Sequence, residues 1–72
     1  MLIALKAGQP QQALDECEHG LRLNPNNAYF VFARGVAKKR LGDMAGGDVD
    51  IATAKELARH VDEIFTKYGI TP

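Results

Sequence analysis

Turn-forming residues divide the first two thirds of the chain into segments of helical length. Gly8, the run Asn24-Pro25-Asn26-Asn27 and Gly42-Asp43 follow one another at intervals of about 15 to 18 residues, the length of one helix and its turn. Apolar residues between these turns recur at helical spacing, and no stretch alternates apolar and polar residues as a half-buried strand does. The pattern predicts an all-α fold built from antiparallel helical hairpins.

Five helices are predicted, covering residues 1–7, 10–23, 27–41, 44–57 and 60–68. The third differs from the others because it is apolar on two faces, with Phe30 on one stripe and Phe32 and Val36 on a second. Such a helix is expected to pack on one side and to line a surface on the other. Residues 48–68 contain neither proline nor glycine, so the pattern leaves open whether 44–68 is one helix or two helices separated near Ala58.

Composition excludes several classes of function. The chain has 72 residues, zero formal net charge and one cysteine, so we expect one domain, no internal disulfide and no nucleic-acid partner. Cys17 and His19 lie two residues apart on a predicted helix, where their side chains diverge, so neither a metal nor another cofactor is expected. No catalytic nucleophile and base share a plausible spacing, so we predict that the protein is not an enzyme.

Hydropathy argues against a membrane protein. The longest apolar run, residues 28–33, has six residues. A membrane span needs about 20 residues. Residues 1–5 are apolar but too short for a signal-peptide core and have no preceding basic residue. We therefore expect no membrane partner and a cytoplasmic protein.

The sequence is similar to itself at an offset of 34 residues. This offset aligns Gly8 with Gly42, Ala13 with Gly47, Cys17 with Ile51, Gly20 with Ala54 and Leu23 with Leu57. A 34-residue period of helix, turn and helix is the signature of the tetratricopeptide repeat. The chain resembles that family, with small residues where neighbouring helices approach closely, and the resemblance implies a short solenoid of stacked hairpins.

Within this resemblance, residues 1–27 correspond to the second half of one repeat, residues 28–58 to a full repeat and residues 59–72 to a capping helix and tail. Arg34 and Lys38 stand where the family usually has large apolar residues, and Arg59 replaces the proline that usually closes a repeat. The tail resembles the capping helix, ending in Tyr-Gly-Ile, of some bacterial tetratricopeptide proteins. These features are typical of the C-terminal end of an array.

The resemblance also implies a function, because the first helix of each repeat lines a concave groove that binds proteins or peptides. The residues that would face the groove are Tyr29, Phe32, Val36, Lys39 and Arg40. Two aromatic rings and two cations suit an extended peptide with apolar and acidic groups. The alternative is a structural cap or oligomerisation unit, with the groove closed by the chain's own tail or by a second copy.

The N-terminal end offers a second candidate surface. Met1 to Ala7 supply only about two helical turns, so Leu2, Ile3 and Leu5 are predicted to be partly exposed. Contiguous exposed apolar residues usually mark an interface. These three residues therefore predict either a homodimer formed through this end or a longer repeat array.

Overall fold

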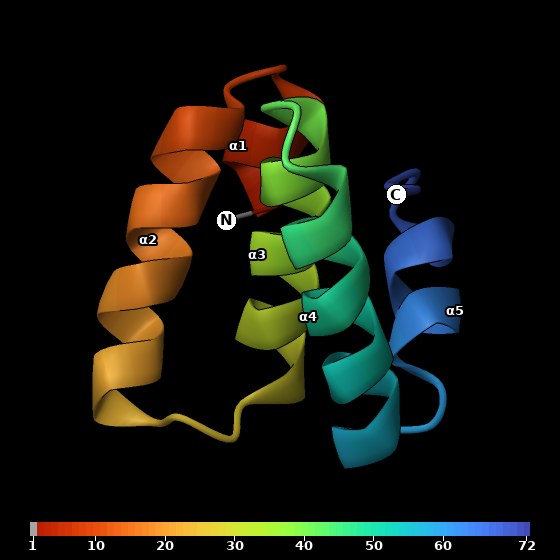
Figure 1. Cartoon of the computed structure of the whole chain (residues 1–72). Coiled ribbons are helices and arrows are strands. Elements are labelled where there is room, and N and C mark those ends of the chain that lie inside the picture. Colours follow the sequence, from red (N-terminus) through yellow and green to blue (C-terminus); the bar gives the residue numbers. More distant parts are fainter. Residues whose placement is uncertain (1) are drawn as a thin grey trace.

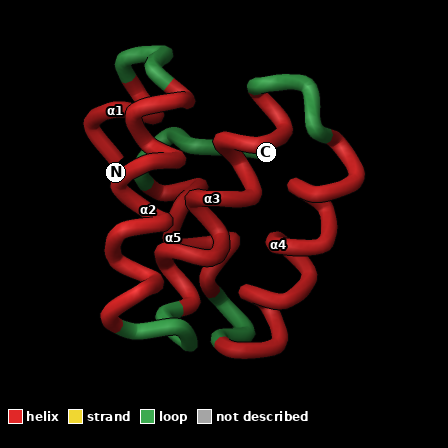
Figure 2. Tube along the Cα trace, turned by 60° about the vertical axis from the view of Figure 1, so that its left-hand side comes forward, coloured by secondary structure: helices red, strands yellow, loops and turns green. Residues whose placement is uncertain are grey.

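The chain is all-helical in the computed structural model, which describes residues 2–72 and contains five helices and no strand over that range (Figures 1 and 2). The helices are α1 (Leu2–Lys6), α2 (Pro10–Leu23), α3 (Ala28–Arg40), α4 (Met44–Leu57) and α5 (Val61–Lys67). The all-α prediction is confirmed, and each helix begins and ends close to its predicted bounds. Met1, the first residue of the predicted helix 1–7, lies outside the described residues.

Residues 44–68, for which the sequence allowed either one helix or two, form the two helices α4 and α5. Ala58 has an extended backbone, with φ −148° and ψ 108°, and its N–H donates to the carbonyl of Ala54 as the last bond of α4. The chain then turns, and α5 begins at Val61. The break allows α5 to fold back against the bundle instead of extending α4 into solvent (Figure 1).

Short polar side chains and glycines define the helix ends. The Asn27 carboxamide oxygen accepts hydrogen bonds from the N–H groups of Tyr29 (3.0 Å) and Phe30 (3.4 Å) at the start of α3. Asp43 caps α4 in the same way, with Gly46 N–H as its donor at 3.0 Å. Gly8 and Gly42, which are 34 residues apart in sequence, both have the left-handed conformation, with φ of 73° and 99°. The two turns at the repeat offset therefore share one backbone conformation.

Helix α3 lies at the centre of the molecule and contacts each of the other four helices (Figure 1). Its buried residues are Ala28, Val31, Phe32, Ala33, Gly35, Val36 and Ala37. The prediction that this helix is apolar on two faces is confirmed. Both faces are used for packing within the chain.

A close backbone approach and a buried carboxylate join α3 to α4. A Cβ atom at Gly35 would lie only 2.8 Å from the carbonyl oxygen of Gly47 and 2.9 Å from Cγ1 of Ile51. One turn further along α4, the buried Asp50 carboxylate accepts two hydrogen bonds from Arg34, at 2.9 and 3.0 Å, and lies 3.1 Å from Nζ of Lys38. This pairing raises the pKa of the Arg34 guanidinium and satisfies the Asp50 oxygens.

The Gly35 contact provides the first test. We expect Gly35→Ala to lower the free energy of unfolding by about 1–3 kcal/mol, because the new methyl group meets backbone that cannot move aside. This loss should outweigh the gain of about 1 kcal/mol in helix propensity. Thr53→Ala, at an exposed position of α4, is the matched control and should be neutral or slightly stabilising. Urea denaturation measures both, and an equal or higher stability for Gly35→Ala would contradict the close approach.

Candidate binding cleft

The predicted groove on α3 is closed. Phe32 and Val36 have no exposed surface, and the Phe32 ring packs on Phe65 of α5 with a centroid distance of 4.6 Å and an interplanar angle of 43°. Val61 and Ile70, on either side of Phe65, are buried too. The prediction that Phe32 and Val36 bind a partner in an open groove is therefore wrong, because α5 and the segment after it cover that face.

The two cations predicted to line the groove bond within the chain. Arg40 donates from Nη1 to the carbonyl oxygen of Leu5 at 2.6 Å and from Nη2 to that of Thr71 at 3.5 Å. It thereby links the end of α3 to α1 and to the C-terminal tail. Lys39 Nζ lies 2.9 Å from a carboxylate oxygen of Asp48. Their roles in this structure are intramolecular.

Of the two aromatic residues predicted to line the groove, Tyr29 keeps a large exposed surface, 45% of its maximum. It lies beside a small pocket of about 310 Å³, whose other lining residues are Leu2, Ile64, Phe65 and Tyr68. This pocket lies between α1 and α5, where the open groove was expected. It is too small for an extended peptide.

The predicted self-association residues divide into two groups. Leu5 is 1% exposed and belongs to the core, so its prediction as an intermolecular contact is wrong: its side chain is already covered by the bundle. Ile3 is 85% exposed, and Leu2 is half-buried. Both lie at one end of a larger cleft. Self-association through them stays a prediction.

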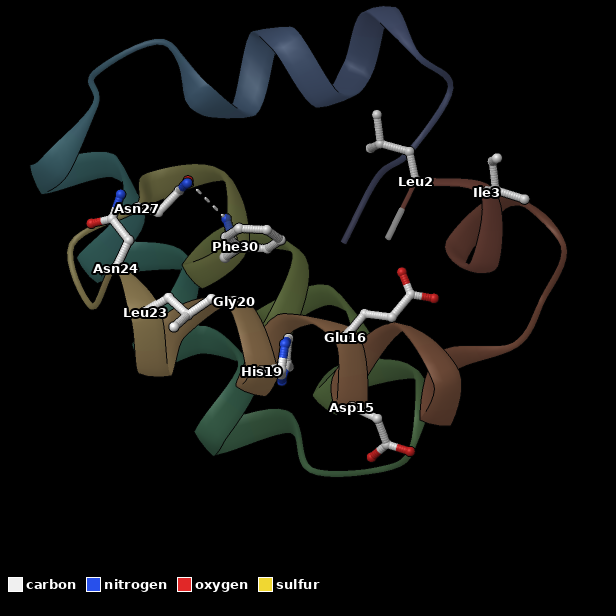
Figure 3. Close-up of a pocket in the computed structure, with 10 residues that line it drawn as sticks. All are labelled: Leu2, Ile3, Asp15, Glu16, His19, Gly20, Leu23, Asn24, Asn27 and Phe30. Carbon is white, nitrogen blue, oxygen red and sulfur yellow. Dashed lines mark hydrogen bonds between the residues drawn. The ribbon is translucent and has the colours of Figure 1, made fainter.

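The larger cleft has a volume of about 1090 Å³ and is formed by the start of α1, one face of α2 and the start of α3 (Figure 3). Its lining residues are Leu2, Ile3, Asp15, Glu16, His19, Gly20, Leu23, Asn24, Asn27 and Phe30. Phe30 packs closely on α2, since a Cβ atom at Gly20 would lie 2.6 Å from its ring. The Phe30 N–H also donates to the side chain of Asn27, which caps the start of α3 and so fixes the backbone that carries this ring. The cleft therefore has an aromatic wall set by a glycine and a helix cap.

Exposed apolar and acidic groups surround this wall. Leu23, at the far end of the cleft from Ile3, is 80% exposed. Asp15 and Glu16 project from α2, where they accept hydrogen bonds from Gln11 (3.0 Å) and Gln12 (3.3 Å). No lysine or arginine lines the cleft within residues 2–72. The cleft thus combines exposed apolar surface with carboxylates.

The sequence predicted the exposed apolar residues Leu2 and Ile3 at one end of this cleft but not the rest of its lining. The sequence placed Leu23 in the 34-residue repeat and Phe30 on an apolar helical stripe, and neither position predicts an exposed surface. The available signal was Gly20, a glycine inside a helix next to a short loop and an aromatic residue, since such a glycine usually marks a close approach.

Cys17 is a residue of α2 whose side chain is fully buried in the core. Burial raises the pKa of its thiol to about 11, from a usual value of 9.0, so the neutral thiol predominates at physiological pH. The described residues contain no group of three or more histidine, cysteine, aspartate or glutamate side chains that could hold a metal ion. Cys17 is thus a packing residue.

The thiol supplies the second test. At pH 8 we expect a thiol reagent to label Cys17 only when the chain unfolds, at a rate that rises with urea. The raised pKa stabilises the fold below pH 9, and this contribution is lost as the pH rises from 9.0 to about 11. Between pH 9.0 and about 11, the free energy of unfolding of Cys17→Ala should therefore fall less steeply than that of the unmodified chain. Rapid labelling of the native protein would contradict the burial of Cys17.

The closed groove supplies the third test. We expect Phe32→Ala to lower the free energy of unfolding by about 3–5 kcal/mol, because it leaves a cavity under Phe65. Tyr29→Ala, one helical turn away and half exposed, should cost less than about 1 kcal/mol. Phe32→Leu retains most of the volume and keeps the comparison measurable if Phe32→Ala does not fold. Equal losses at positions 29 and 32 would show an open groove.

Comparison with known proteins identifies no relative of the chain: no family model, curated protein or solved structure matches it. Among the described residues, none of the helices is both long enough and apolar enough to span a bilayer.

Proposed function

We propose that the chain is a protein–protein interaction module of tetratricopeptide type, without catalytic activity, whose partner binds in the cleft between α1, α2 and α3. The observation that carries this proposal is the cleft itself, with Ile3 and Leu23 exposed at its two ends and the ring of Phe30 between them. Surface of this kind usually marks an interface. The peptide groove expected on α3 is replaced by this cleft.

Two further features support the repeat assignment within this proposal. The turns after α1 and α3 share a left-handed glycine at a separation of 34 residues. Gly35 and Gly47 allow α3 and α4 to approach each other closely. Both are properties that a stack of helical hairpins requires.

A structural cap is the second candidate function, and the packing of α5 favours it. Phe65 and Ile70 cover the face of α3 on which another helix would otherwise stack. The two functions are compatible, since α5 terminates one side of the molecule while the cleft leaves the other side open. In an assembly the chain would be the last unit, in contact with its neighbour through the cleft.

Site-specific photo-crosslinking gives the fourth test. A benzophenone amino acid placed at Leu23 should form a covalent adduct with one discrete protein in the cells that produce the chain. The control is Val49, which is 65% exposed on α4 and outside the cleft. Adducts that are absent at position 23, or equally abundant at both positions, would contradict the proposed function.

A further inference from the structure

We propose that the cleft binds a short amphipathic helix of a partner protein, with leucine-like residues on one face and a lysine or arginine placed to meet Asp15. This inference rests on the proposed function and specifies the chemistry of the partner. It depends on the shape of the cleft, its charge, and the engagement of the chain's own cations.

The shape of the cleft fits a helix. Its α2 wall consists of Asp15, Glu16, His19, Gly20 and Leu23, which recur along one face of that helix (Figure 3). The wall from Asp15 to Leu23 is about 12 Å long, which is about two turns of a helix lying alongside it. Apolar residues spaced three and four apart on such a helix would meet Leu2, Phe30 and Leu23 in succession.

The charge of the cleft favours a partner helix that carries a cation over one that carries a carboxylate. Asp15 is exposed on the α2 wall, and no lysine or arginine belongs to the described lining. A cation on the bound helix would therefore find an opposite charge. A carboxylate at the same place would meet a like charge.

The same observations argue against a second copy as the occupant. Two copies that pair through the same face would place two Asp15 carboxylates in one interface with no lysine or arginine from the described lining of either cleft. The chain's one run of cations, Lys38, Lys39 and Arg40, is engaged with Asp50, Asp48 and the carbonyls of Leu5 and Thr71. These cations are therefore not available to bind in the cleft of another copy.

The experiment uses two synthetic peptides of about 12 residues with the same leucine positions. One carries lysine at the flanking positions and the other carries glutamate. Fluorescence anisotropy with the full chain at about 150 mM salt should show the lysine peptide binding about tenfold more tightly. Leu23→Ser, at an exposed position, should weaken the binding of the lysine peptide.

Charge reversal at Asp15 is the decisive variant. Asp15→Lys should weaken binding of the lysine peptide about tenfold and should strengthen binding of the glutamate peptide. Glu18→Lys makes the same change in net charge at another exposed α2 position outside the cleft lining, and its effect should be less than about twofold at this ionic strength. Circular dichroism verifies that both variants remain helical.

The inference would be overturned if neither peptide binds, if both bind equally, or if the two charge reversals have equal effects. It would also be overturned if sedimentation shows a dimer that Leu23→Asp dissociates, which would assign the cleft to a second copy. Photo-crosslinks at position 23 that persist unchanged in Asp15→Lys would also overturn the proposal that the partner is a cationic helix. They would leave the proposed function intact.

Discussion

The packing of the Phe65 ring on Phe32 is the contact on which the architecture depends. Helix α3 has apolar residues on both sides, and a chain of this length has few elements to cover them. By folding α5 back after Ala58, the chain brings Val61, Phe65 and Ile70 onto the face that α2 and α4 leave open. A helix that could have served a ligand becomes the centre of the core.

The polar contacts reinforce this arrangement at two places. Asp50 is buried, but Arg34 and Lys38 neutralise it and occupy its oxygens, so that its burial leaves no unsatisfied group. Arg40, at the end of α3, links α1 to the C-terminal tail by donating to a backbone carbonyl of each. Of the two cations that the sequence pattern assigns to a binding surface, Arg40 thus holds the chain's own ends against its central helix, and Lys39 pairs with Asp48 on α4.

The helices were predictable because their ends have local causes. Asn27, Asp43 and the left-handed glycines act within a few residues of sequence, and the apolar stripes follow from helical periodicity. The pairing of Arg34 with Asp50 was also within reach. Both lie eight residues from Gly42, one before it and one after it, so an antiparallel hairpin that turns there brings them together.

The candidate site was not predictable in the same way, because it depends on which helix covers which face. The stripe of Phe32 and Val36 suits a ligand and the chain's own α5 equally well, and periodicity does not distinguish between them. The cleft at Phe30 depends on the aromatic ring lying over Gly20, a contact between two helices. Both outcomes are decided by tertiary packing.

The central claim is that α5 packs on α3 in solution, and nuclear Overhauser effects between aromatic protons test it most directly. With a centroid distance of 4.6 Å between the rings of Phe32 and Phe65, we expect strong cross-peaks between them, together with helical chemical shifts for Val61–Lys67. Absence of these cross-peaks in a folded sample, with random-coil shifts for α5, would contradict the account. The face of α3 would then be open, as a peptide-binding groove requires.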